Sequence, residues 1–189
     1  MTVELQRVTA EQIDQFRAEL LAVYRAVFTL PPYNEAEPDF AAFAESFSRH
    51  VQHPDFRCYV ARDSATRQVC GFAYGFTIDA ESRWYEFFYD LLQPQGREDW
   101  LADCFIMVEL AVMPEYQGKG IGGRLHDALL ADTSHRTAVL STAQHENAAL
   151  HLYRRRGWEI LAQDWFFDQG EQPFYLLGLD LVTRRADSR

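Results

Sequence analysis

One stretch of the chain, residues 104–130, limits the possible folds more than any other. It reads CFIMVELAVMPEYQGKGIGGRLHDALL. The run over residues 105–112 is too rich in bulky and β-branched residues for a surface element, so it predicts a buried strand. Pro114 ends that strand, and closely spaced glycines then precede the apolar repeat of a helix. This order can point backbone N–H groups and the positive end of a helix dipole at an anion, so it predicts a phosphate-binding turn.

Two nucleotide-binding patterns compete for this turn. Gly118, Gly120 and Gly123 satisfy G-x-G-x-x-G, the pattern of dinucleotide-binding folds. That pattern should follow its strand at once and open further βα repeats, but residues 114–117 intervene and only residues 124–189 remain. A Walker A motif is absent, because no Gly-Lys-Ser/Thr follows. The second pattern, Gln/Arg-x-x-Gly-x-Gly/Ala, is met by Gln117, Gly118, Lys119, Gly120, Ile121 and Gly122.

With its strand, proline and helix in order, the second pattern resembles the first signature of the GNAT superfamily of acyl-CoA-dependent N-acyltransferases. Residues 147–158, NAALHLYRRRGW, resemble the second signature, in which an Asn and a helical Leu-Tyr precede a Gly-aromatic pair. The specific motifs lie within residues 104–158. The resemblance implies an α+β fold of three α/β/α layers around a mixed, largely antiparallel twisted sheet. It covers nearly the whole chain.

Length and composition limit the class of protein. A chain of 189 residues with 48% hydrophobic content suits one domain with a sizeable core, here residues 1–183, followed by a frayed tail over 184–189. The net charge of −10 argues against a nucleic-acid partner and mildly favours a cationic or amine partner. No apolar run is long enough to span a membrane, and no His, Cys or Asp spacing resembles a metal site.

Cysteine usage favours a reducing compartment. Cys58, Cys70 and Cys104 form no C-x-x-C pair, and the first residues lack the basic start and apolar run of a secretion signal. We therefore expect a cytoplasmic protein.

Apolar periodicity and turn residues predict the order of the elements. The predicted strands lie near residues 3–7, 56–62, 69–78, 105–112, 137–143, 158–162 and 174–181. The predicted helices follow residue 9, Pro38 and the glycine-rich turn, and a further one covers residues 147–155. Residues 79–103 add two short helical candidates separated by Gly96. This segment is dense in aromatic residues, which are more often core or a subunit interface, as in a homodimer, than a substrate cage.

Acetyl transfer from a thioester to an amine needs a base, because an alkylammonium with a pKa of about 10 is mostly charged at neutral pH. Glu109 is the best-placed carboxylate, since an apolar strand would raise its pKa toward a useful value. A structural glutamate satisfied by neighbouring backbone groups is the alternative. Family members often carry a glutamate at this strand position that acts through water, while others place the base elsewhere.

The resemblance assigns the remaining roles at the thioester. A Tyr in the place of Tyr153 protonates the departing sulfur, and a phenol suits this as a neutral donor; a core tyrosine is the alternative. The Asn in the place of Asn147 bonds the pantetheine arm, although Asn147 is equally a helix N-cap. The implied acetyl-CoA contacts are the backbone of Leu110, Ala111 and Val112, and the turn and helix start at Gln117, Gly118, Lys119, Gly120, Ile121, Gly122, Gly123 and Arg124.

The sequence predicts the acceptor site least firmly. In folds of this kind, the loop between the first two helices and the segment before the central strand build the acceptor side of the cleft. Here these segments offer Tyr33, Glu35, Trp84 and Tyr85. Aromatic faces and carboxylates together suit a cationic amine. A core or dimer contact is the alternative for the aromatic residues.

The leading hypothesis is an N-acetyltransferase that transfers an acetyl group from acetyl-CoA to a primary amine of a small molecule, without a metal. The alternatives are a peptide or protein N-acetyltransferase, a catalytically silent acyl-CoA-binding module, and a dinucleotide-binding protein. The aromatic segment before the central strand favours a covered pocket, and hence a small acceptor.

Overall fold

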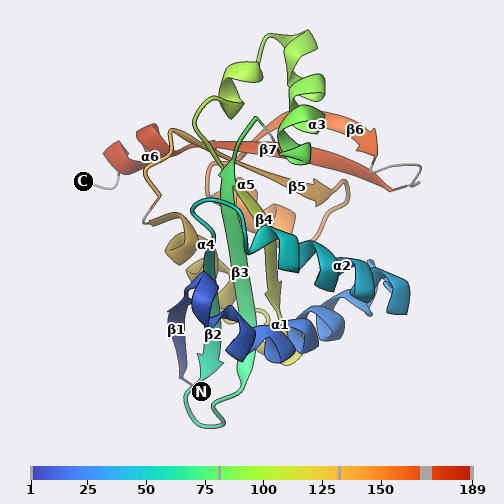
Figure 1. Ribbon diagram of the computed structural model, residues 1–189, viewed down its shortest axis with the longest axis vertical. Helices are drawn as coiled ribbons and strands as arrows, with labels where there is room; N and C mark the ends of the chain where they lie inside the picture. Colours follow the sequence, from blue (N-terminus) through green and yellow to red (C-terminus); the bar gives the residue numbers. More distant parts are fainter. Residues whose placement is uncertain (1, 81, 132, 167–171, 188–189) are drawn as a thin grey trace. The chain divides into compact units, whose positions relative to one another are not determined.

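The structure is a computed structural model that describes residues 2–80, 82–131, 133–166 and 172–187 (Figure 1). A seven-stranded sheet has the order β1-β2-β3-β4-β5-β7-β6. Its strands are β1 (Val3–Val8), β2 (Arg57–Asp63), β3 (Val69–Ile78), β4 (Cys104–Val112), β5 (Thr137–Ala143), β6 (Glu159–Phe166) and β7 (Pro173–Asp180). The helices are α1 (Ile13–Phe28), α2 (Glu37–His50), α3 (Arg83–Leu92), α4 (Ile121–Ala131), α5 (Ala148–Arg155) and α6 (Leu181–Asp187).

Strand pairing makes the sheet mixed and largely antiparallel. The pairs β1–β2, β2–β3, β5–β7 and β6–β7 are antiparallel, whereas β4 and β5 run parallel. The parallel register joins residues 104–106 to residues 137–139. The predicted α+β class with a mixed, largely antiparallel sheet is therefore confirmed.

The chain divides into two compact units, and each is built from separate stretches of sequence. The first unit contains Met1–Phe76 and Val108–Thr133, and the second contains Thr77–Met107 and Ser134–Arg189. The single domain over residues 1–183 stays a prediction.

In the first unit, helices cover both faces of β3. Phe47 of α2 meets Tyr74 edge to face, with ring centroids 5.0 Å apart. The opposite face at Gly71 lies against Leu125 of α4. Side chains of a strand point alternately to the two faces of the sheet, and both faces are covered here. Every residue of β3 except Thr77 is therefore buried. The apolar run of this strand thus reflects cover on two sides.

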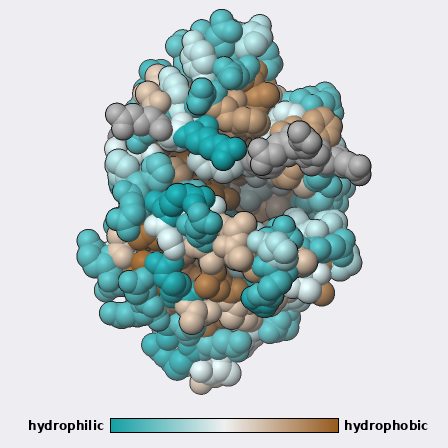
Figure 2. Space-filling view, turned by 45° about the vertical axis from the view of Figure 1, so that its right-hand side comes forward, coloured by the Kyte–Doolittle hydropathy of each residue, from teal (hydrophilic) through white to brown (hydrophobic). Residues whose placement is uncertain are grey.

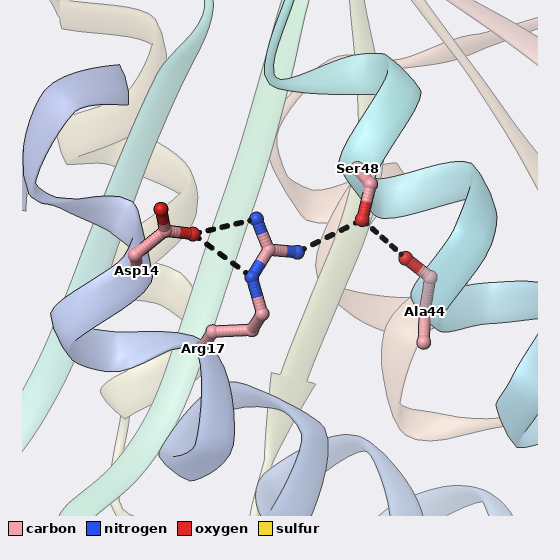
Figure 3. A network of polar contacts seen from close by, with 4 residues as sticks. All are labelled: Asp14, Arg17, Ala44 and Ser48. Carbon is pink, nitrogen blue, oxygen red and sulfur yellow. Dashed lines mark hydrogen bonds and ion pairs between the residues drawn. The ribbon is translucent and has the colours of Figure 1, made fainter.

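Helices α1 and α2 form because their apolar residues recur at helical spacing, as the sequence predicts. Five residues of the predicted apolar stripe of α1 are buried: Ile13, Phe16, Leu20, Val23 and Tyr24. A polar network also joins the two helices (Figure 3). The Arg17 guanidinium donates to Asp14 Oδ1 at 2.8 and 3.0 Å and to Ser48 Oγ at 3.0 Å. Such exposed contacts contribute little stability, so burial of the apolar stripes holds the pair together.

The second unit has an aromatic core between α3 and the strands β6 and β7. Phe87 meets Trp165 edge to face at 5.1 Å, and Trp165 lies 5.3 Å from Phe174. This core accounts for part of the aromatic density of residues 79–103.

The frayed tail expected over residues 184–189 begins within a helix, because residues 184–187 belong to α6. Asp180 caps that helix, because its Oδ1 accepts the N–H groups of Val182 and Thr183 at 2.9 and 3.0 Å. Leu181 is buried, which ties the first turn down. Residues 188 and 189 lie outside the described residues.

The face drawn in Figure 2 is mainly hydrophilic, with apolar residues in patches between the hydrophilic ones. Among the described residues, no helix combines the length and apolarity needed to cross a bilayer. The same residues contain no group of three or more His, Cys, Asp or Glu arranged to hold a metal ion.

Gly71 allows β3 and β4 to approach closely. A Cβ atom at this position would lie 2.9 Å from the Ala111 carbonyl oxygen, which cannot move without shifting β4. We expect Gly71→Ala to lower the free energy of unfolding by about 1–3 kcal/mol, because overpacking forces backbone shifts. Urea unfolding followed by circular dichroism measures this loss. An unchanged midpoint and slope of the urea unfolding curve would show that β3 and β4 accommodate the added methyl group without loss of stability.

Candidate active site

The glycine-rich turn between β4 and α4 lies wholly within the first unit. Gly118 and Gly120 have backbone φ angles of +70° and +78°, which residues with a side chain rarely adopt. A Cβ atom built at either position would meet nothing within 4 Å. The Gln117 side chain anchors the turn by donating to the Val112 carbonyl at 2.8 Å. The turn is therefore a fixed stretch of backbone with open space beside it.

Helix α4 begins at Ile121, so the first N–H groups of a helix, which have no acceptor within the helix, follow directly on the turn. Ile121 and Gly123 are buried and Gly122 is half-buried, whereas Lys119 and Arg124 are exposed. The Lys119 ammonium donates to the Glu115 carbonyl at 2.6 Å. A bare backbone, a helix N-terminus and two exposed cations are the features that a pyrophosphate group requires. The predicted turn residues fit that group.

Glu109 is half-buried in the middle of β4. Its Oε1 accepts the N–H of Leu110 at 3.0 Å. The pKa of Glu109 is raised to about 8, chiefly by burial; the Leu110 N–H lowers it, and the negative charge of Glu35 adds to the rise. A carboxyl group with this pKa can take up and release a proton near neutral pH.

Three tyrosines of the first unit interact electrostatically with Glu109. Burial raises the pKa of Tyr24, Tyr33 and Tyr74, and the charge of Glu109 is the next cause in each case. The Tyr24 hydroxyl also donates to Glu35 Oε1 at 3.2 Å. The structure therefore brings together Glu109, Tyr33 and Glu35, which the sequence predicts for one site.

The sequence did not predict Tyr24 and Tyr74 for this site. Tyr24 was assigned to the apolar stripe of α1, and Tyr74 sits in the apolar run of β3. A second buried polar group, His50, meets the Tyr74 hydroxyl through Nδ1 at 3.1 Å. Burial lowers the pKa of His50 to about 4, so its imidazole is neutral near physiological pH. For Tyr24, Tyr74 and His50 alike, the sequence offered one signal: a polar group within an otherwise apolar periodic run.

Tyr153 and Asn147 belong to the second unit. Tyr153 is buried on α5 and meets Trp158 edge to face at 5.8 Å. Asn147 caps α5, because its Oδ1 accepts the Leu150 N–H at 2.8 Å, and its amide nitrogen lies 3.1 Å from His145 Nε2. The N-cap alternative for Asn147 is thus confirmed, and its contact with pantetheine stays a prediction.

Trp84 and Tyr85 also lie in the second unit, in the first turn of α3. Both are half-buried, and the Ser82 hydroxyl caps the helix by accepting their N–H groups at 3.1 and 3.3 Å. Trp84 lies 5.4 Å from Phe88 within the same helix. Their contact with an acceptor stays a prediction.

Residues 54–160 match the family model described as "Acetyltransferase (GNAT) domain", which is more than half of the chain. The chain belongs to the GNAT acetyltransferase family. This family is one of acyltransferases that depend on acetyl-CoA.

Known GNAT proteins resemble the chain in sequence and in fold. It is 32% identical over 84 residues to the GCN5-like protein acetyltransferase Rv2170 of Mycobacterium tuberculosis, an alignment that covers 43% of this chain. The alignment spans only 41% of that relative's length.

Solved structures agree with the fold over most of the chain. A protein from Desulfovibrio desulfuricans assigned to the GNAT family has a TM-score of 0.67 and 16% identity, covering 95% of this chain and 99% of that one. NAA60 of Arabidopsis thaliana, solved with a bisubstrate analogue, has a TM-score of 0.62 and 18% identity, and the match covers 95% of this chain and 98% of that one. At these identities the likeness supports the GNAT fold alone.

Proposed function

We propose that this GNAT protein transfers the acetyl group of acetyl-CoA to a primary amine of a small molecule. The observation that carries the proposal is the Glu109 carboxyl, which lies half-buried in the middle of β4 and accepts the Leu110 N–H at 3.0 Å; its raised pKa, about 8, suits a general base for an alkylammonium. Tyr24, Tyr33 and Tyr74 are electrostatically coupled to this carboxyl, and burial raises the pKa of each of them.

In the proposed reaction, ionised Glu109 takes a proton from the acceptor ammonium, directly or through water. The neutral amine attacks the thioester carbonyl carbon, so that a C–N bond forms as the C–S bond breaks. The nitrogen gives its second proton to water as it becomes an amide. Tyr153 donates its hydroxyl proton to the leaving sulfur, which departs as the CoA thiol. Tyr153 then regains a proton from water, and Glu109 releases its proton to water before the next turnover.

The donor site of this proposal contains the residues that the sequence assigns to acetyl-CoA. The backbone at Leu110, Ala111 and Val112 pairs with the pantetheine amides as a short strand would, and Asn147 bonds the same arm. The turn from Gln117 to Gly123 binds the pyrophosphate, with Lys119 and Arg124 adding positive charge. The open space beside Gly118 and Gly120 supports this assignment.

The acceptor site of the proposal contains Tyr33, Glu35, Trp84 and Tyr85. Tyr33 and Glu35 are supported by their electrostatic coupling to Glu109. Trp84 and Tyr85 are included for the aromatic faces that they offer to a cationic amine.

A peptide or protein acceptor is the second candidate. It is favoured by the relatives, since the matched Mycobacterium protein is described as a protein acetyltransferase. The two candidates predict different substrates, so they are separable by assay.

The three cysteines of the chain bear on where this reaction would occur. Cys58, Cys70 and Cys104 are all free and buried. Free thiols suit a reducing compartment, which supports a cytoplasmic enzyme.

A panel of amines, amino acids and N-terminal peptides, assayed for acetyl-CoA-dependent release of the CoA thiol, tests the function. We expect small cationic amines to react with the highest kcat/KM. Faster reaction of peptides would favour the second candidate. No release with any acceptor would support the silent acyl-CoA-binding module.

Replacing Tyr153 by Phe tests the proposed acid. We expect kcat to fall by about tenfold to a hundredfold, because the thiolate must then leave without a positioned proton donor. Isothermal titration should show unchanged acetyl-CoA affinity. Tyr175→Phe, which removes a hydroxyl from β7, is the matched control and should keep the wild-type rate. Equal rates in both variants would place the acid elsewhere.

A further inference from the structure

Glu35 is held firmly in the loop between α1 and α2. Its backbone N–H donates to the Phe28 carbonyl at 2.8 Å, and its Oε1 accepts the Tyr24 hydroxyl at 3.2 Å. The other carboxylate oxygen, Oε2, is buried, and no group in the described part of the chain bonds it. A buried oxygen without a donor is costly, so this carboxylate is placed for a partner that the chain itself does not supply.

Stacked aromatic rings accompany Glu35. Tyr24 stacks on Phe43 with centroids 3.6 Å apart and on Phe28 at 4.2 Å. The ring of Tyr33 lies 4.6 Å from that of Phe28. The faces of Tyr24 are engaged by the two phenylalanine rings, so the ring that can offer a face to a cation is Tyr33, which is tilted against Phe28 and not stacked on it. A positively charged donor therefore suits the unbonded oxygen.

The charges nearby point the same way. Burial and Asp39 raise the pKa of Glu35, and burial and Glu35 raise the pKa of Glu109. Within the described residues, no cation is among the groups that shift either carboxyl. The arginines of the two neighbouring helices pair with other acids: Arg17 with Asp14, Arg25 with Glu37, and Arg49 with Glu45. In the part of the chain that the structure describes, these two coupled carboxyl groups thus have no positive counter-charge.

We propose that Glu35 binds a second cationic group of the acceptor, which makes the preferred acceptor a diamine. One ammonium gives its proton to Glu109 and reacts, while the other donates to Glu35 Oε2 and keeps its charge. The proposal rests on the acetyl transfer proposed above. A monoamine loses its only charge before it attacks, so Glu35 would then bind nothing during the reaction.

The test compares linear diamines from diaminopropane to diaminohexane with the matching alkylmonoamines, using CoA thiol release. We expect the best diamine to exceed its monoamine in kcat/KM by about tenfold or more, with an optimum in chain length. In Glu35→Gln, which keeps an oxygen for the Tyr24 hydroxyl, this ratio should fall close to one. The readout is this ratio and not either rate alone, because the charge of Glu35 also acts on the pKa of Glu109, so its removal alters the rates with both kinds of amine.

Glu37→Gln is the matched control, because Glu37 is exposed at the start of α2 and pairs with Arg25. It should leave the diamine preference intact. Equal kcat/KM for diamines and monoamines in the wild type, or a preference retained in Glu35→Gln, would overturn this inference and leave the proposed function standing. No thiol release with any amine would instead count against the proposed function.

Discussion

Glu109→Gln is expected to lower kcat/KM about a hundredfold or more near neutral pH, the largest loss for a single carboxyl in this protein. General bases contribute roughly a hundredfold to ten-thousandfold to proton transfer. The glutamine keeps the shape and an oxygen for the Leu110 N–H, so only the base is removed. Steady-state kinetics with the best amine of the panel measure the effect.

The pH profile separates loss of a base from loss of binding. Because Glu109 acts when ionised, wild-type kcat/KM should rise with pH through an apparent pKa of about 8. In Glu109→Gln this limb should vanish, and the rate should recover partly at high pH, where free amine is abundant. Glu115→Gln removes an exposed acid between β4 and α4 and should retain the wild-type profile. A wild-type limb in Glu109→Gln would place the base elsewhere.

Stability provides an independent check on Glu109. Its folded pKa of about 8 lies above its ordinary value of 4.5, so the folded state binds more protons between these values. Folding therefore loses stability as pH rises through this window. The Glu109→Gln substitution should remove this pH dependence. Above pH 8, the variant should unfold no more easily than the wild type. A catalytic defect could then not be attributed to unfolding.

Gly120→Asp is expected to abolish measurable acetyl-CoA binding. The new carboxylate would stand where the pyrophosphate is proposed to lie, and like charges repel at a helix N-terminus that otherwise favours anions. The fold should persist, because a Cβ at Gly120 meets nothing within 4 Å and Asp tolerates positive φ better than most residues. Isothermal titration with acetyl-CoA measures the loss.

Two variants control for backbone strain and for charge. Gly96→Asp places the same residue at a positive φ of 66° with open space around it, outside the turn, and should bind acetyl-CoA normally. Gly120→Asn adds the same bulk without the charge and should retain more affinity than Gly120→Asp. Unchanged affinity in a folded Gly120→Asp protein would contradict the phosphate assignment of the turn.

Elements with strong local signals could be predicted from the sequence. Thr137–Ala143 was predicted as a strand with the bounds that β5 has, because its apolar run ends at polar residues. The cap of α5 at Asn147 and the end of α1 before Pro31 follow from the chemistry of single residues. The helix over Leu181–Asp187 was not predicted, because its first turn is held by the Asp180 cap and the burial of Leu181, and only the structure shows the latter.

The candidate site was predictable only in part. Glu109 is conspicuous as a charge within an apolar strand, and the loop position of Glu35 suggested contact with an acceptor. Tyr24 and Tyr74 fit the apolar periodicity of their elements, so periodicity alone assigned them to the core. Their electrostatic coupling to Glu109 depends on how α1, β3 and β4 pack, which local sequence does not encode. The sequence likewise does not show that, among the described residues, Glu35 Oε2 is buried without a hydrogen-bond donor; only the structure does.

Transfer of an isotope-labelled acetyl group tests the central claim most directly. The protein would be incubated with acetyl-CoA labelled in the acetyl carbonyl and with the best amine of the panel, and the products identified by mass spectrometry and NMR. We predict that the label appears in an N-acetyl amide, one amide for each CoA thiol released, and that Glu109→Gln slows its formation near neutral pH. Label found only in free acetate, or no loss of label from acetyl-CoA, would contradict the account.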